Sequence, residues 1–314
     1  RGLSGIFSNK SNLFNIEFLK MFFDIIKFYK KSSQISISNY KMTLGEYLKI
    51  NKLSKTFIDY HIIPMVSAIW SMPPYEASKM PINFFLKFFQ NHGLFRLKNR
   101  PQWYTVSNRS RTYVKKIVSQ ISGEHYKNYK IKKIKRKSSG LNLYYGGENE
   151  FFDYDKVILA THADEALKLI ENPTEDEKNI LSNFSYKENL AYIHTDKRAM
   201  PTNKKAWSSW NSSIDDKNLN KNSITYWLNP LQNLNCDENI FLTLNPYFRI
   251  DEAKVLKKVK FNHPYYDQKA LDSQSELVKL QNQKDILFCG SYFGYGFHED
   301  GIKSSIEMLK NLND

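Results

Sequence analysis

The stretch Ile286-Leu287-Phe288-Cys289-Gly290-Ser291-Tyr292-Phe293-Gly294-Tyr295-Gly296-Phe297-His298-Glu299-Asp300-Gly301-Ile302 lies near the end of the 314-residue chain. It begins with a short apolar run that suits a buried strand, and it continues through glycines at 290, 294 and 296. These glycines allow positive φ and let a flat ligand approach the backbone closely. A helix is expected after Gly301, with its free N–H groups and positive dipole end directed at the same space. The order strand, tight loop, helix therefore predicts a site for an electron-rich or anionic group.

This segment resembles the carboxy-terminal flavin-binding motif of the FAD-dependent amine oxidase and phytoene desaturase superfamily, most closely a bacterial branch of NAD/FAD-binding proteins. Other motifs of that branch follow in the same order along nearly the whole chain: Thr43-Leu44-Gly45-Glu46-Tyr47-Leu48, Ala68-Ile69-Trp70-Ser71-Met72-Pro73-Pro74, Phe88-Phe89-Gln90-Asn91-His92-Gly93-Leu94, Arg100-Pro101-Gln102-Trp103, Leu159-Ala160-Thr161-His162-Ala163-Asp164, Trp207-Ser208-Ser209-Trp210-Asn211 and Thr225-Tyr226-Trp227-Leu228-Asn229. One departure occurs at Asn108-Arg109, where the family usually has a glycine pair before the serine of Ser110-Arg111. Asn tolerates left-handed geometry better than most residues do.

The resemblance implies a mixed α/β (α+β) fold. A Rossmann-like FAD/NAD(P)-binding domain would carry an inserted substrate domain of the amine oxidase type, built from helices and an antiparallel sheet. Residues 1–110 would form the helical part of the substrate domain, 111–170 the return to the FAD-binding domain, 171–280 the sheet and helices of the substrate domain, and 281–314 the carboxy-terminal FAD-binding strand, loop and helix. The chain starts at Arg1 and contains no Gly-x-Gly-x-x-Gly fingerprint, which opens proteins of this superfamily. We therefore expect a fragment with an incomplete FAD-binding domain, inactive on its own.

Local patterns predict the individual elements. Residues 14–31 have the spacing of an amphipathic helix, which either packs on the core or presents a lipid-binding face. Thr43 with Glu46, and Thr174 with Glu177, form capping boxes that start two further helices. Strands or strand-like runs are expected at 129–134, 141–145, 156–160, 191–195, 223–228 and 240–244. The run 157–160 is continuous and apolar, so burial on both faces is expected, whereas 217–222 is expected to be a polar loop.

The resemblance implies FAD as the cofactor and a set of residues that bind it. This set comprises Ile131, Ala160, Thr161, Gly290, Ser291, Glu299, Asp300, Gly301 and Ile302. Ile131 would contact adenine through backbone atoms, and the helix start at Gly301 would face the flavin ring. Four residues are candidates for an aromatic substrate wall, although each is also a plausible core residue: Trp103, Trp227, His263 and Tyr295. No catalytic side chain is assigned, because the isoalloxazine itself accepts the hydride.

Composition excludes several other classes. The formal net charge is +14, but Lys outnumbers Arg and no motif of interleaved aromatics and arginines is present, so no nucleic-acid partner is predicted. Cys236 and Cys289 are far apart and predict neither a disulfide framework nor a zinc site, and no metal is expected. No apolar run reaches the ~18 residues of a spanning helix. A cytoplasmic location is expected, with 14–31 as a candidate for peripheral contact with the inner membrane face.

The leading functional hypothesis is an FAD-dependent oxidoreductase that transfers hydride from an apolar substrate, such as a fatty-acyl or other lipid, to the flavin. One alternative is an amine oxidase acting on a small amine or polyamine, which would need an anionic or aromatic-cage site. Another is a flavin-free binding protein that keeps the fold, and the intact motif from Gly290 to Gly301 argues against it.

Overall fold

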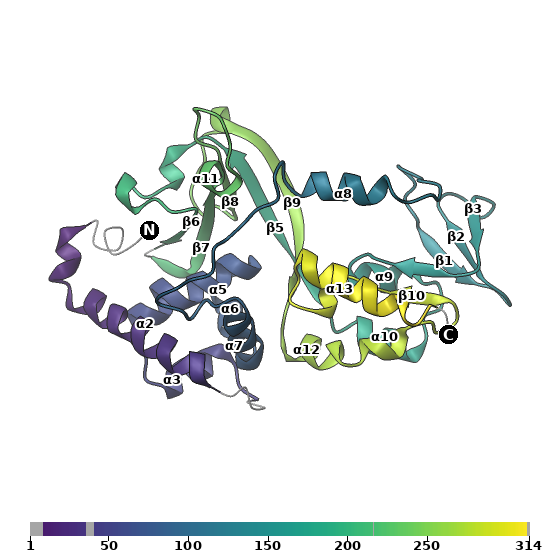
Figure 1. Ribbon diagram of the computed structural model, residues 1–314, viewed down its shortest axis with the longest axis horizontal. Helices are drawn as coiled ribbons and strands as arrows, with labels where there is room; N and C mark the ends of the chain where they lie inside the picture. The colour runs from purple at the N-terminus through teal and green to yellow at the C-terminus, as the bar shows by residue number, and fades with distance from the viewer. Residues whose placement is uncertain (1–8, 36–40, 216, 313–314) are drawn as a thin grey trace. The chain divides into compact units, whose positions relative to one another are not determined.

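The computed structural model describes residues 9–35, 41–215 and 217–312 (Figure 1). The chain divides into two compact units, each built from two separate stretches of sequence. Unit 1 contains Arg1–Ile121 and Lys187–His263, and unit 2 contains Ser122–Tyr186 and Pro264–Asp314. The functional domain ranges expected from the resemblance remain predictions, since this division rests on packing alone.

Unit 1 begins with helices and short helical turns. They are η1 (Lys10–Leu13), α2 (Ile16–Gln34), α3 (Leu44–Ile50), α4 (Lys55–Phe57), the π-helical turn η2 (Ile58–Ile62), α5 (Ile63–Trp70), α6 (Pro74–Ser78), α7 (Ile82–Asn91) and α8 (Ser110–Val118). The capping box of Thr43 and Glu46 is present as predicted. Pro81 is the N-cap residue of α7. The π turn lies directly before Pro64, where a proline disturbs the regular helix ladder.

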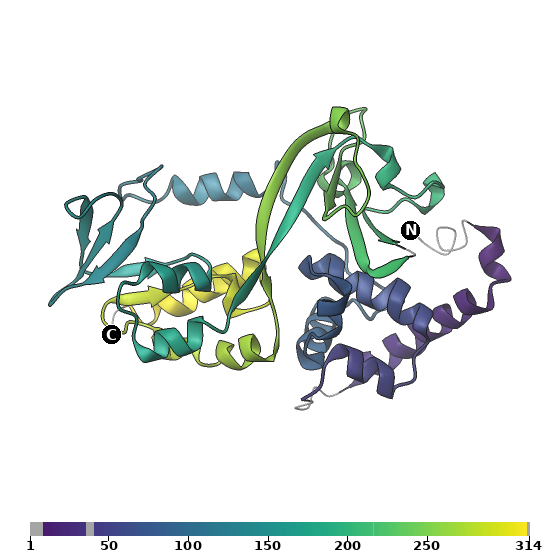
Figure 2. The ribbon, with the colours of Figure 1, turned by 180° about the vertical axis from the view of Figure 1, so that it is seen from behind.

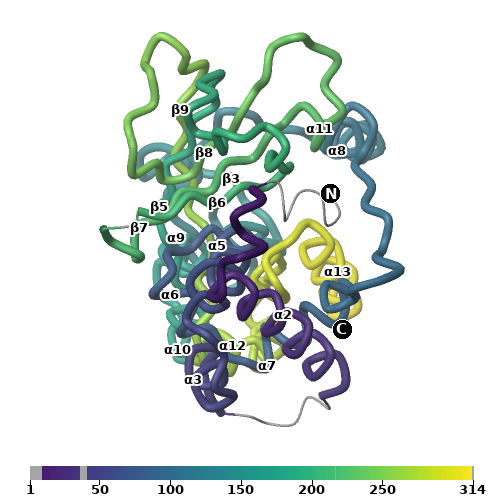
Figure 3. Tube along the Cα trace, turned by 90° about the vertical axis from the view of Figure 1, so that its left-hand side faces the viewer, coloured from purple at the N-terminus to yellow at the C-terminus, as the bar shows by residue number. Residues whose placement is uncertain are grey.

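Aromatic side chains form the core of this helical part. Phe28 of α2 lies with its ring centroid 5.3 Å from that of Phe57, and the rings of Phe85 and Phe89 are 4.1 Å apart. All four side chains are buried. The predicted helix at 14–31 is confirmed as α2, which is purple in Figure 3 and forms one side of the helical part of unit 1. One face of α2 is therefore core-packed.

The rest of unit 1 is mainly an antiparallel sheet with the strand order β6-β7-β8-β5-β9. The strands are β5 (Ser185–His194), β6 (Trp210–Asp215), β7 (Asn218–Trp227), β8 (Phe241–Leu244) and β9 (Val255–Tyr265), accompanied by η3 (Lys197–Ala199), η4 (Lys204–Ala206), α11 (Leu228–Gln232) and η5 (Glu252–Lys254). Figure 2 shows β5 and β9 as two long ribbons side by side. On one face α5 packs against β6 and β7, and the Tyr226 hydroxyl donates to the Ala68 carbonyl at 2.8 Å.

The polar loop expected at 217–222 was a wrong prediction. Residues Asn218 to Asn222 belong to β7 and pair with the end of β6, with Ile214 opposite Asn222. The β6–β7 hairpin extends its ladder into polar sequence because backbone hydrogen bonds do not require apolar side chains.

Unit 2 contains two small sheets and helices around one core. The strands are β1 (Lys133–Arg136), β2 (Leu141–Tyr144), β3 (Phe151–Tyr154), β4 (Val157–Leu159) and β10 (Ile286–Phe288), and the helices are α9 (Ala163–Leu169), α10 (Glu175–Leu181), α12 (Gln268–Gln274), η6 (Leu277–Leu280), η7 (Ser291–Phe293) and α13 (His298–Leu309). Strands β1, β2 and β3 form an antiparallel sheet, whereas β4 pairs in parallel with β10. The core contains Ile134, Leu159, Phe288 and Tyr292.

The strand predictions for unit 2 missed one strand and were wrong about the burial of another. The third strand beside β1 and β2 is Phe151–Tyr154, which the sequence patterns missed, and the run 156–160 lies in the other sheet. That run is also not buried on both faces, because Ile158 is 44% exposed. Among the described residues β4 pairs with a single strand, β10, so its other edge has no strand beside it. The exposure of Ile158 shows that one face of β4 is also only partly covered. No helix in the part of the chain that the structure describes is long and apolar enough to cross a membrane.

Candidate cofactor site

The carboxyl ends of two parallel strands bring the two halves of the predicted site together. Val157 pairs with Ile286 and Leu159 with Phe288, so the segments that leave β4 and β10 emerge at the same edge. The Thr161 carbonyl oxygen lies 3.5 Å from the position that a Cβ would take at Gly290. Ligands of open α/β sheets bind at this edge, outside the carboxyl ends of the strands.

The loop after β10 needs its glycines for its own packing. A Cβ at Gly290 would lie 2.7 Å from the Tyr292 ring, and one at Gly296 would lie 2.6 Å from the Tyr266 hydroxyl. A Cβ at Gly294 would overlap the Asp300 carboxylate. Glycine allows positive φ at all three positions, but only Gly290 and Gly296 adopt it, whereas φ of Gly294 is −139°. These three glycines are explained without any ligand.

Helix α13 begins four residues earlier than predicted, at His298 rather than after Gly301. The cause is local: the Asp300 carboxylate reaches back and accepts the Phe297 N–H at 3.0 Å, which fixes the helix start there. Glu299 pairs with Lys303 at 3.5 Å on the same helix. The two acidic residues assigned to cofactor binding therefore make contacts within α13.

Ser304 joins α13 to the end of β10, and the sequence patterns gave no signal for it. Its Oγ accepts the Gly290 N–H at 2.9 Å and donates to the Gly301 carbonyl at 2.7 Å. Gln274 of α12 similarly holds the loop, because its Nε2 donates to the carbonyls of Tyr292 and Gly294 at 3.0 and 2.6 Å. The position of the loop is thus set by side chains outside the glycine motif.

Gly301 differs from the other glycines because nothing near it requires a glycine. A Cβ built there would have the Ser291 nitrogen as its nearest neighbour, at 3.9 Å, and its φ is not positive. A glycine in the first turn of a helix costs up to about 1 kcal/mol relative to alanine. Open space therefore lies beside the backbone at the start of α13, next to Ser291.

The residues predicted on the β4 side line one cavity of about 790 Å³ in unit 2. Ile131, Ala160 and Thr161 are among its lining residues, and the cavity follows β4 along its length from Val157. Lys168 of α9 also lines it and donates to Asp164 at 2.7 Å. Most of its wall is apolar, which suits the flat ring system of a nucleotide better than a phosphate group.

Comparison with solved structures shows the same architecture in several enzymes, whereas family models and curated proteins gave no match. A fatty acid isomerase from P. acnes that produces CLA is superimposed with a TM-score of 0.62 at 12% identity, over 94% of this chain and 75% of that one. Putrescine oxidase bound to putrescine gives 0.63 at 10% identity, over 96% and 76%. Cyclohexylamine oxidase from Brevibacterium oxydans IH-35A gives 0.57 at 10% identity, over 87% and 68%. The chain has the amine oxidase fold. At the level of the fold, this confirms both the predicted mixed α/β class and the resemblance to the amine oxidase superfamily.

Three of the four candidates for the substrate wall lie in unit 1 and one lies in unit 2. Trp103 is 65% exposed and lies in the segment before α8. Trp227 packs edge-on against Trp207 at 5.2 Å, in a small core with Met200 and Phe241. It therefore has a structural role in unit 1.

The other two candidates lie in different units. His263 of β9, in unit 1, stacks on Phe261 at 5.8 Å. Tyr295 lies in unit 2 in the loop after β10, and burial, reinforced by the nearby Asp300 carboxylate, raises the pKa of its phenol to about 12. Tyr295 is thus a neutral hydroxyl at physiological pH, within the loop proposed to bind the cofactor.

The departure from the family pattern at Asn108-Arg109 has a clear structural counterpart. Both residues have positive φ, 59° and 69°, where the family usually has glycines. Arg109 is also the N-cap residue of α8, with ψ of 179°. That combination is nearly restricted to glycine, so the turn keeps the shape of a glycine pair at a cost in backbone strain.

Proposed function

We propose that this chain forms part of a flavin-dependent oxidoreductase that takes a hydride from its substrate, with FAD held by unit 2 at the carboxyl ends of β4 and β10. The observation that carries the proposal is Gly301, a helix-start glycine that no other described residue requires. When bound, FAD would supply the hydride-accepting chemistry. The amine oxidase fold supports this assignment.

The residues present fit such a group. The cavity along β4 would receive the adenosine part of the cofactor, with Ile131, Ala160 and Thr161 contributing mainly backbone and apolar surface. The first turn of α13, at Gly301 and Ile302, would approach the ring system through backbone, where the positive end of the helix dipole stabilises negative charge. Asp300 holds this turn in place, because its carboxylate accepts a hydrogen bond from the Phe297 N–H.

The proposed substrate is apolar and lipid-like. Its support is the aromatic-rich helical part of unit 1, the basic amphipathic helix α2, and the fold shared with a fatty acid isomerase. A small amine or polyamine is the second candidate, because two fold neighbours are a cyclohexylamine oxidase and a putrescine oxidase.

The test uses protein produced from its complete coding sequence. We expect a yellow protein that releases FAD on denaturation and whose flavin is bleached under anaerobic conditions by a long-chain fatty acid or acyl ester. Bleaching by putrescine alone would favour the amine oxidase alternative. A colourless protein that gains no flavin absorbance when FAD is added would overturn the proposal and favour a flavin-free binding protein.

A further inference from the structure

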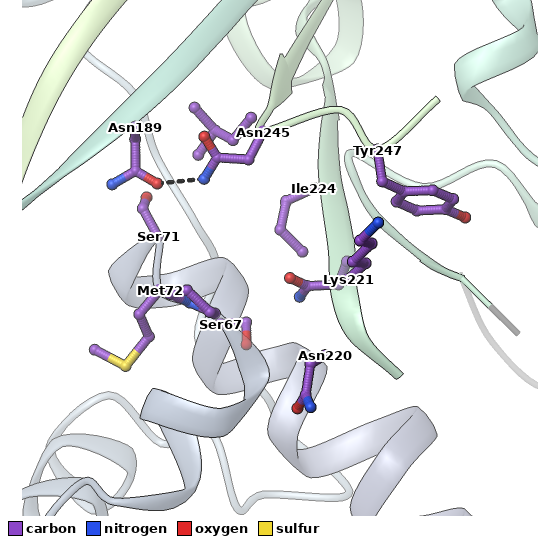
Figure 4. Close-up of a pocket in the computed structure, with 12 residues that line it drawn as sticks. Ser67, Ser71, Met72, Asn189, Asn220, Lys221, Ile224, Asn245 and Tyr247 are labelled. Atoms are coloured by element: carbon purple, nitrogen blue, oxygen red, sulfur yellow. Dashed lines mark hydrogen bonds between the residues drawn. The ribbon is translucent and has the colours of Figure 1, made fainter. Parts of the chain in front are cut away.

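A second cavity, of about 360 Å³, lies entirely within unit 1 (Figure 4). Helix α5 and the residues after it supply one side, including Ser67 and Met72. The other side comes from the beginning of β7 and the end of β8, and Figure 4 shows Asn220, Lys221 and Ile224 there. Small-molecule pockets begin at about 300 Å³, so the cavity is large enough for a short organic molecule.

Most polar groups around this cavity are already engaged with protein. Asn245 Nδ2 donates to Asn189 Oδ1 at 2.6 Å, the dashed contact in Figure 4, and Asn245 Oδ1 accepts the Leu190 N–H at 2.9 Å. The Tyr247 hydroxyl is 2.6 Å from Ser213 Oγ. Ser71 hydrogen-bonds to the Tyr226 hydroxyl. These side chains fix the wall and are not free for a ligand.

Two buried donors at the cavity are not engaged. Ser67 is 1% exposed and its Oγ makes no hydrogen bond, and the Nδ2 atom of Asn222 is likewise buried without a partner. Both residues line the cavity. An unpaired buried donor costs about 1–3 kcal/mol, so two at one cavity indicate a missing acceptor.

The other residues that line the cavity indicate which kind of ligand would carry that acceptor. Met72, Pro73, Ile224 and Leu244 provide apolar surface, and Lys221 provides one positive charge. No Asp or Glu occurs among the described residues that line the cavity. The donors and the lysine suit a negatively charged acceptor, whereas a cationic head group would find no counter-charge.

We propose that this cavity binds a small organic carboxylate, with its carboxylate accepting from Ser67 Oγ and Asn222 Nδ2 and its short apolar chain lying against Met72 and Leu244. The site belongs to unit 1 alone and does not depend on the proposed flavin function. A ligand there would join α5 to β7, since Ser67 belongs to α5 and Asn222 to β7.

The probe is hexanoate, compared with hexan-1-ol and hexylamine, which share its apolar chain. Binding to the full chain is measured by isothermal titration calorimetry and by the shift in the thermal unfolding midpoint. We expect saturable binding of hexanoate, weaker binding of hexan-1-ol and none of hexylamine. Because a hydrogen-bond donor to the charged carboxylate is lost, Ser67→Ala should weaken hexanoate binding about tenfold or more. Asn222→Ala should act in the same direction.

Ser32→Ala is the matched control. Ser32 is also a fully buried helical serine of unit 1 whose Oγ has no partner, but it does not line the cavity. Both serine variants should unfold at or above the parent temperature without ligand, since each removes an unpaired hydroxyl. Absence of saturable hexanoate binding, equal binding of hexylamine, or an unchanged hexanoate affinity in Ser67→Ala would overturn the proposal and indicate a cavity filled by water.

Discussion

The glycines after β10 differ in whether the packing of the chain itself requires them. Gly290, Gly294 and Gly296 each lie against atoms of unit 2, whereas Gly301 has no neighbour within 3.9 Å of a Cβ. A glycine motif read from sequence cannot make this distinction, because both kinds look the same in a pattern. The structure explains the first three by loop packing, and we propose that Gly301 faces the cofactor.

Replacing Gly301 by leucine should reduce the flavin content of the protein without lowering its thermal unfolding midpoint. The added side chain enters space that is open in the chain but lies beside the proposed flavin position. Gly301→Ala should raise the free energy of unfolding of the flavin-free form by up to about 1 kcal/mol, as helix propensity predicts. Flavin absorbance per mole of protein and thermal melts are the measurements. Gly294→Leu is the contrasting control: it should lose stability first, through its collision with Asp300.

We expect the substitution Arg109→Gly, which restores the glycine usual in the family, to stabilise the protein. The φ of 69° with ψ of 179° at Arg109 is strained for any residue with a Cβ. Arg109→Gly should raise the free energy of unfolding by roughly 1 kcal/mol, after the larger entropy of glycine in the unfolded chain is subtracted. Urea unfolding followed by tryptophan fluorescence measures the difference. Arg111→Gly, inside α8, should instead lower the free energy of unfolding. Equal effects of the two substitutions would show that the backbone at Arg109 is not strained.

Among the elements, two helices start with the same capping box but in different surroundings. Thr43 with Glu46 starts α3, and Thr174 with Glu177 starts α10. Glu46 is exposed, whereas Glu177 is fully buried and pairs with Arg136 at 2.5 Å. The sequence pattern predicts both boxes but not the buried ion pair, since Arg136 comes from a strand about 40 positions earlier.

Glu177→Ala should therefore destabilise far more than Glu46→Ala. The exposed box loses a cap, worth about 1 kcal/mol. The buried one also leaves Arg136, 16% exposed, without its partner, and breaking a buried pair costs roughly 3–5 kcal/mol. Urea midpoints of the two variants give the comparison. Similar losses in both would show that the Arg136–Glu177 pair adds nothing to the cap.

Helix α2 has an exposed stripe that suits a charged lipid surface. Lys20, Lys27, Lys30 and Lys31 are exposed, together with Phe23 at 66% and Ile16 at 78%. The residues of this stripe recur at helical spacing, opposite the buried Phe28 and Tyr29. Basic and apolar groups on one face are typical of helices that lie at membrane surfaces.

Changing these four lysines to glutamine should abolish co-sedimentation with acidic vesicles and leave flavin content unchanged. Each lysine near an anionic surface contributes on the order of 1 kcal/mol, and the attraction falls within a Debye length. Parent protein should therefore be released as salt is raised. If neutral vesicles bind it equally well, the stripe is an ordinary solvent-exposed helix face.

The elements that were predictable from sequence are those set by near neighbours. Both capping boxes and α2 follow from residues three or four positions apart. The β3 strand and the polar half of β7 were missed because their positions depend on partners, β2 and β6, rather than on their own side chains. Gln274 and Ser304 were missed for the same reason, since no local pattern shows that they hold the loop after β10.

At the scale of the whole molecule, the excess positive charge belongs to one unit. Unit 1 has 31 Lys and Arg against 13 Asp and Glu, a balance of +18, and unit 2 has 15 against 19, a balance of −4, which together give the +14 of the chain. A net charge cannot be read as a property of the whole surface here. The basic character lies with the unit that carries α2.

Exposed lysines should therefore differ in their effect on binding to a cation exchanger. Replacing Lys49, Lys52, Lys98 and Lys257 of unit 1 by glutamine should lower the salt concentration needed for elution. The same number of changes in unit 2, at Lys127, Lys130, Lys269 and Lys284, should have a clearly smaller effect. Equal shifts for the two sets would show that the charges act as one uniform field.

The parallel pairing of β4 with β10 also sets an order of events during synthesis. Val157 meets Ile286 only after the 128 residues between them have been made, including the whole second stretch of unit 1. Contacts so distant in sequence form late, after the entropy of a long loop has been overcome. The helices of unit 1 can pack while the ribosome is still translating. The edge that carries Thr161 and Gly290 forms only when β10 has left the ribosome, so a chain that stops before Ile286 lacks the proposed cofactor site but keeps both sequence stretches of unit 1.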